Sequence, residues 1–124
     1  MPDSQKSIFI TGVGSGIGKA TALLFAQRGW LVAGYDVRQD SLTAVGRSGE
    51  VTQGKLDLLF NNAGIDAKGP FVEMAWERIE QIVSVNLIGG VALIREAFPL
   101  LANTPGSMCL STASASAIVG VPGM

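Results

Sequence analysis

The sequence contains no histidine and only one cysteine, Cys109, among its 124 residues. Without histidine, the chain lacks the usual base that activates a serine or cysteine nucleophile, and also the commonest ligand of a catalytic zinc ion. A single cysteine cannot form a disulfide within the chain, and its place in an apolar run predicts a small, buried side chain. We therefore expect neither a metal site nor a histidine-dependent triad.

An excess of charge of one sign is also missing, since 9 Lys and Arg against 10 Asp and Glu give a formal net charge of −1. No basic cluster is available to neutralise phosphates, which argues against nucleic-acid binding. The first seven residues form no apolar leader, and no uninterrupted apolar run reaches the roughly 18 residues of a membrane span. We expect a cytoplasmic protein with no membrane partner.

Hydrophobic residues and glycine are abundant, at 48% of the chain and 16 residues respectively. This hydrophobic content can form a buried core and argues against disorder. Because domains contain roughly 100–200 residues, we expect one domain over residues 1–124. The glycines indicate tight turns and close backbone approaches.

Short apolar runs typical of strands alternate with helical patterns along the chain. The expected strands are Ser7–Ile10, Leu31–Tyr35, Leu56–Phe60 and Ser107–Ala113, and the expected helices are 17–27, a weaker 39–45, and 73–102. This alternation indicates a Rossmann-type α/β fold, with a mostly parallel, doubly wound sheet in three layers. Ligands of such sheets bind beyond the carboxyl ends of the strands.

A glycine-rich turn, T-G-V-G-S-G-I-G over Thr11–Gly18, joins the first expected strand to the first expected helix. Glycines permit a sharp turn and the approach of a pyrophosphate to the backbone, while the helix N-terminus favours the anion. The G-x-G-x-x-G pattern fails, because Ile17 or Lys19 stands at its last position. The P-loop pattern lacks its leading glycine at Val13 and its hydroxyl at Ala20. We predict a dinucleotide phosphate site.

Asp36 ends the second expected strand. A carboxylate at this position can accept hydrogen bonds from an adenosine ribose diol and repels a 2′-phosphate. Arg38 lies two residues further and can bend toward a 2′-phosphate, which leaves NADP open. We predict NAD as the cofactor.

The turn resembles that of the short-chain dehydrogenase/reductase family, whose members carry T-G-x-x-x-G-I-G after the first strand. The resemblance extends from Ile8 to Gly123 and includes the segment Asn61-Asn62-Ala63-Gly64 after the third expected strand. It implies an oxidoreductase that transfers hydride between a nicotinamide and a small alcohol or ketone, and we expect a homo-oligomer. The expected cofactor-binding residues are Gly12, Ser15, Gly16, Ile17, Gly18, Asp36, Asn62, Ala63 and Gly64.

The resemblance also implies two catalytic residues, Asn86 and Ser114. Asn86 interrupts a helical pattern, where asparagine is unfavourable, and in the family it helps to hold a water that connects to the catalytic lysine. Family spacing to Gly120 selects Ser114 over the alternatives Ser111 and Ser116. Its implied role is to orient the substrate oxygen and not to act as a nucleophile, because no histidine base is present.

The sequence departs from the family pattern in two places. Its only tyrosine, Tyr35, belongs to the second expected strand, and the family's Tyr-x-x-x-Lys pair would come just beyond Met124. The interval between Asp36 and Asn61 is shorter than in the family and lacks a strand and a helix, apart from a weak strand signal at 49–52.

These departures leave two explanations open, residues omitted from a longer protein or a truncated product. A product of 124 residues alone would have negligible dehydrogenase activity. One alternative function is a non-catalytic dinucleotide-binding module. The other is an NTPase-like or flavodoxin-like nucleotide binder, but the sequence contains neither a Walker motif nor a flavin motif to support it.

Overall fold

The structure, a computed structural model, describes residues 5–38 and 54–120. Its four strands are β1 (Ser7–Thr11), β2 (Leu31–Tyr35), β3 (Leu58–Asn61) and β4 (Met108–Ser111). They form one sheet in the order β2-β1-β3-β4, and every neighbouring pair is parallel.

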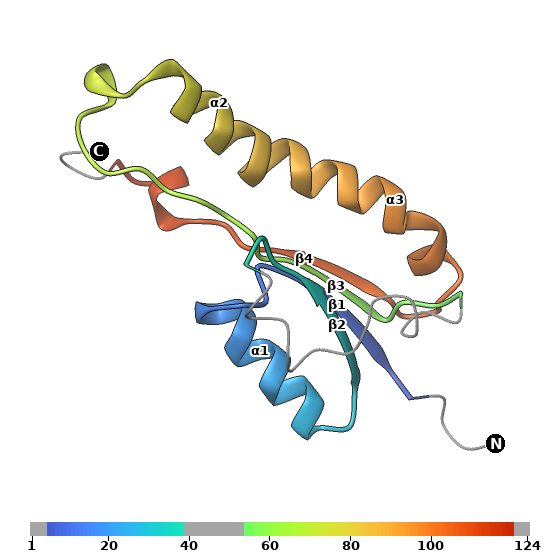
Figure 1. The fold of residues 1–124 in the computed structure, drawn as a ribbon. Coiled ribbons are helices and arrows are strands. Elements are labelled where there is room, and N and C mark those ends of the chain that lie inside the picture. The colour runs from blue at the N-terminus through green and yellow to red at the C-terminus, as the bar shows by residue number, and fades with distance from the viewer. Residues whose placement is uncertain (1–4, 39–53, 121–124) are drawn as a thin grey trace.

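Helices cover both faces of this sheet (Figure 1). Helix α1 (Gly16–Gln27) lies on one face, while α2 (Trp76–Val83) and α3 (Gly90–Ala102) lie on the other. A π-helical segment, η3 (Ser84–Gly89), joins α2 to α3, and short 3₁₀ helices occur at η2 (Phe71–Glu73) and η4 (Ala115–Ala117). The predicted three-layer, doubly wound α/β fold is confirmed.

The boundaries differ from the expected ones by a few residues. The long helix begins at Trp76 and not at position 73, because η2 and an extended Ala75 precede it. Strand β3 begins at Leu58, and β4 is limited to Met108–Ser111. The expected helix at 39–45 and the strand signal at 49–52 lie outside the described residues.

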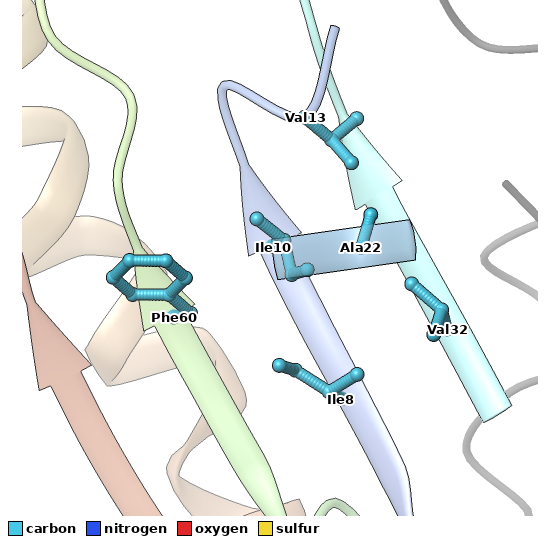
Figure 2. Packing of buried hydrophobic residues seen from close by; sticks show 6 residues of the cluster. All are labelled: Ile8, Ile10, Val13, Ala22, Val32 and Phe60. Carbon is cyan, nitrogen blue, oxygen red and sulfur yellow. The ribbon is translucent and has the colours of Figure 1, made fainter. Parts of the chain in front are cut away.

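The larger hydrophobic cluster lies between the sheet and α1. Ile8 and Ile10 alternate along β1, so both side chains point to this face, and both are fully buried. Figure 2 shows the whole cluster, which consists of Ile8, Ile10, Val13, Ala22, Val32 and Phe60. Burial of each large aliphatic side chain here contributes about 1.5–3 kcal/mol.

A second cluster lies on the opposite face, under α3. Leu56, Leu59 and Ala97 form its buried centre. The partly buried residues packed against them are Phe9, Leu93, Ile94, Leu100 and Leu101. Since β1 and β3 are covered on both faces, their sequences are nearly continuous apolar runs without polar alternation.

Cys109 is exposed, so the prediction of a buried cysteine is wrong. All four residues of β4 are exposed. Strand β4 is the last in the strand order of the described sheet and pairs only with β3. An apolar run indicates burial only where neighbouring elements cover it, and no described element does so for Cys109.

The stretch Trp76–Ala102, of 27 residues, is long and apolar enough to cross a membrane by length and composition alone. A single helix of this kind is weak evidence of a membrane span, because core helices of soluble proteins are also long and apolar. Leu93 and Ile94 of this helix pack against the sheet. The absence of a membrane partner remains a prediction.

We predict that Gly34→Ala destabilises the fold by about 1–3 kcal/mol, because overpacking a close contact forces backbone shifts. A Cβ at this position would lie 2.7 Å from the carbonyl oxygen of Ile10 and 2.9 Å from the Cβ of Val13. The matched control is Gly120→Ala, whose added methyl group meets nothing within 4 Å. Chemical denaturation measures both variants, and equal free energies of unfolding would contradict the prediction.

Candidate functional site

The carboxyl ends of the strands and the N-terminus of α1 meet at one end of the sheet (Figure 1). The glycine turn follows β1, Asp36 follows β2, and Asn62 follows β3. The register aligns these ends, since Thr11 pairs with Tyr35 and Ile10 pairs with Phe60. The structure therefore brings together the residues that the sequence predicts for a cofactor site.

Two glycines of the turn leave no room for a side chain. A Cβ on Gly12, which has a φ of 69°, would lie 3.0 Å from the Cα of Ala63. A Cβ on Gly18 would lie 2.1 Å from the carbonyl oxygen of Gly12. The turn, the first turn of α1 and the segment after β3 are therefore packed backbone against backbone.

The N-terminus of α1 is without a capping side chain. Ser15 is extended at the N-cap position, its hydroxyl makes no capping hydrogen bond, and the first helical turn contains no acidic residue. The first N–H groups of a helix have no partner within the helix, and its positive end favours an anion. A Cβ on Gly16 would meet nothing within 4 Å. Ile17 is exposed beside it. This arrangement fits a phosphate group.

The carboxylate of Asp36 is engaged on both oxygens. Its Oδ2 accepts a hydrogen bond from the N–H of Gly14 at 2.8 Å, and its Oδ1 accepts one from the N–H of Arg38 at 3.0 Å. The Arg38 Nε lies 3.7 Å from Oδ1, and the Asp36 side chain is only 8% exposed. The Arg38 N–H is the main reason that the pKa of Asp36 is lowered; burial opposes this, and the Gly14 N–H and the Arg38 charge assist it.

Asn62 links the ends of three strands. Its N–H and that of Ala63 both donate to Oγ1 of Thr11, at 3.1 and 3.0 Å. Its side-chain amide donates to the carbonyl of Gly12 at 3.5 Å, and its Oδ1 accepts from the hydroxyl of Thr112 at 3.0 Å. Sequence reasoning does not single out Thr11 or Thr112; the available signal is a hydroxyl residue at the end of β1 and another directly after β4.

Asn86 lies in the π-helical segment η3, and its side chain holds the loop that follows Gly64. Its Nδ2 donates to the carbonyl of Ile65 and its Oδ1 accepts the N–H of the same residue, both at 2.8 Å. The unfavourable helix residue is therefore explained by two bonds outside the helix. The water-holding role implied by the family resemblance remains a prediction.

Ser114 follows β4 and caps η4. Its Oγ accepts the N–H of Ser116 at 3.2 Å and lies 2.7 Å from the Ser116 Oγ. Ser111, the third hydroxyl candidate, is the last residue of β4 and pairs with Asn61. Within the described residues, no hydrogen bond connects Ser114 to the glycine turn or to Asp36.

Comparison with known proteins identifies relatives of this chain. A family model described as short chain dehydrogenase matches residues 36–124. The 3-oxoacyl-[acyl-carrier-protein] reductase FabG of Thermotoga maritima is 30% identical over 95% of this chain and 59% of its own length. The 2,5-dichloro-2,5-cyclohexadiene-1,4-diol dehydrogenase of Sphingobium indicum strain UT26S is 34% identical over 96% of this chain and 58% of its own length.

A solved structure is similar over most of the described fold. The 3-ketoacyl-(acyl-carrier-protein) reductase of Brucella melitensis, complexed with NADH, has a TM-score of 0.76 at 28% identity, covering 90% of this chain and 58% of that protein. The chain thus spans less than two thirds of the length of these relatives. Because the family model matches well over half of the chain, the chain belongs to the short chain dehydrogenase family.

Proposed function

We propose that this chain provides the NAD-binding site of an oxidoreductase that transfers hydride between the nicotinamide ring and an alcohol or ketone. The observation that carries the proposal is the enclosed carboxylate of Asp36 beside the uncapped N-terminus of α1. The relatives support it, since one is complexed with NADH and others are named as a reductase of an oxo compound and a dehydrogenase of a diol. These names favour an enzyme over a binding module.

The phosphates would lie against the first turn of α1. The N–H groups of Gly16, Ile17 and Gly18 have no hydrogen bond among the described residues, and the Ser15 hydroxyl makes no capping bond. Four such donors around the positive end of a helix suit a pyrophosphate. The missing side chain of Gly16 keeps the approach open.

Asp36 would select NAD over NADP. Its carboxyl is ionised at neutral pH, as for an ordinary aspartate, and the lowered pKa extends the charged state to more acidic solution. The carboxylate can therefore accept hydrogen bonds from a ribose diol and repel a 2′-phosphate. Arg38, the residue that could receive such a phosphate, lies beside the same carboxylate, with Nε 3.7 Å from Oδ1. The Asp36 carboxylate thus partly neutralises the Arg38 charge that could otherwise attract a 2′-phosphate.

Asn62, Ala63 and Gly64 would line the opposite wall of the cofactor site. Hydrogen bonds from Asn62 and Ala63 to Thr11 hold this segment beside the glycine turn. Ala63 lies against Gly12, and Gly64 lies near the side chain of Asn86. Small residues at these two positions leave room for the adenosine half of the cofactor.

Ser114 would orient the substrate oxygen. A hydroxyl can donate to a carbonyl oxygen or accept from an alcohol, so it suits either direction of the reaction. No histidine of this chain can deprotonate Ser114, and its proposed role is orientation and not nucleophilic attack. When bound, the nicotinamide supplies or accepts the hydride, and Asn86 would position the loop that borders the site.

We also propose a cytoplasmic homo-oligomer. The support for oligomerisation is an exposed apolar face along η3 and α3, where Leu87, Ile88 and Val91 are exposed. Side chains of this kind are usually covered in an assembly when they form a continuous patch.

We predict that Asp36→Ala weakens NAD binding by about 10-fold to 100-fold, corresponding to one or two lost hydrogen bonds to a charged group. NADP binding should weaken less than NAD binding in this variant, because the repulsion of the 2′-phosphate is removed. Calorimetric titration measures both affinities, with Glu80→Ala on the surface of α2 as the matched control. Equal losses for NAD and NADP would contradict the assignment.

We predict that Ser114→Ala, in the full-length protein, lowers turnover by about 100-fold or more while the NAD affinity stays unchanged, as expected for loss of a group that acts on the reacting oxygen. Steady-state rates on a panel of alcohols and ketones measure the effect. Ser111→Ala and Ser116→Ala serve as controls. A larger loss in either control would transfer the role to that serine.

We predict that NAD affinity is constant from pH 7 down to about pH 5 and weakens only at lower pH. The folded-state pKa of Asp36 lies below the ordinary value of 3.8, so the charged form persists until the pH falls through that lowered value. Titrations across this range test it, with Asp36→Asn as a control of weaker, pH-independent affinity. A loss of affinity centred between pH 5 and 7 would assign the cofactor contact to another group.

A further inference from the structure

The two halves of the glycine turn differ in their hydrogen bonds. In the first half, Gly12 donates its N–H to the carbonyl of Tyr35 at 2.9 Å, and Gly14 donates to the carboxylate of Asp36 at 2.8 Å. Both partners belong to the end of β2 or follow it directly. The second half begins α1, whose first bond runs from the N–H of Lys19 to the carbonyl of Ser15 at 3.1 Å.

The bond between Gly14 and Asp36 restrains a turn that is rich in glycine. Gly12, Gly14 and Gly16 alternate with single residues, and glycine loses more conformational freedom on folding than any other residue. The Asp36 side chain is almost enclosed, and its other oxygen is held by the N–H of Arg38. The acceptor is therefore fixed before any ligand arrives.

We propose that Asp36 is a positioning residue for the phosphate turn as well as the residue that contacts the ribose. Its carboxylate fixes Gly14, and so directs the unpaired N–H groups at the start of α1 toward the ligand. The ligand part of this inference rests on the proposed function, whereas the restraint on Gly14 does not. A site that is ordered before binding gains affinity because less order must be imposed on binding.

Removal of Asp36 has two opposite effects on phosphate affinity, and electrostatics accounts for only one of them. A carboxylate near a phosphate site repels the anion, so the loss of the Asp36 charge strengthens the binding of inorganic pyrophosphate. The loss of the hydrogen bond that restrains Gly14 weakens the same binding. Pyrophosphate has no ribose, and it therefore separates the positioning role from the contact with the diol.

The first measurement is amide hydrogen exchange by NMR in the free protein. In Asp36→Ala, we expect the N–H of Gly14 to exchange at least about tenfold faster, because its protecting acceptor is lost. The N–H of Gly12, bonded to the Tyr35 carbonyl, should keep its rate and shows that the fold is intact. Unchanged exchange at Gly14 would overturn the proposal, whatever the protein binds.

The second measurement is calorimetric titration with inorganic pyrophosphate and, separately, with NAD. We expect Asp36→Ala to bind pyrophosphate at least about threefold more weakly than the unaltered protein. The matched control is Asp66→Ala, which removes a carboxylate that accepts a backbone N–H in another loop, and it should leave pyrophosphate binding unchanged. Unchanged or tighter binding in Asp36→Ala would overturn the positioning role.

The two titrations and the exchange data distinguish the inference from the proposed function. If Asp36→Ala loses NAD affinity but keeps pyrophosphate affinity, the NAD site stands and the positioning role fails. If the unaltered protein binds no NAD while Gly14 is protected only in the presence of Asp36, the proposed function fails and the restraint on the turn stands.

Discussion

The parallel hydrogen bonds that hold β1 between β2 and β3 determine where the rest of this structure can lie. They align Thr11 with Tyr35 and Ile10 with Phe60, and the next ladder aligns Asn61 with Ser111. All four strands therefore end at one level. A shift of a strand by one residue would turn every side chain to the other face of the sheet, and two buried clusters, one on each face, oppose such a shift.

Much of the fold and of the candidate site follows from local patterns. The strand before the glycine turn, the helix after it and the place of Asp36 at the end of β2 are short-range features, which depend on residues close together in the sequence. Once the strands are parallel, their ends must converge. The gathering of Gly12, Asp36 and Asn62 was therefore predictable, although their roles toward a ligand remain proposals.

Other features depend on neighbours that are distant in sequence, and these could not be predicted. The burial of Cys109 was expected from its apolar surroundings, but β4 has no described neighbour on one side and its residues are exposed. The hydrogen bond between Thr112 and Asn62 joins two strand ends far apart in the chain. The asparagine in the helical pattern marks position 86 locally, but the partner of its side chain, Ile65 in another loop, could not be predicted.

The uncapped N-terminus of α1 connects ligand supply to the survival of the folded protein. In many helices the side chain of the N-cap residue accepts a hydrogen bond from one of the first N–H groups, which contributes about 1 kcal/mol. Ser15 of α1 makes no such bond within the part of the chain that the structure describes. A bound phosphate completes the helix in the manner of a capping residue. The population of folded molecules then rises with the concentration of free ligand. On the proposed function, depletion of the ligand would lower the population of folded molecules, and it is the unfolded molecules that proteases degrade.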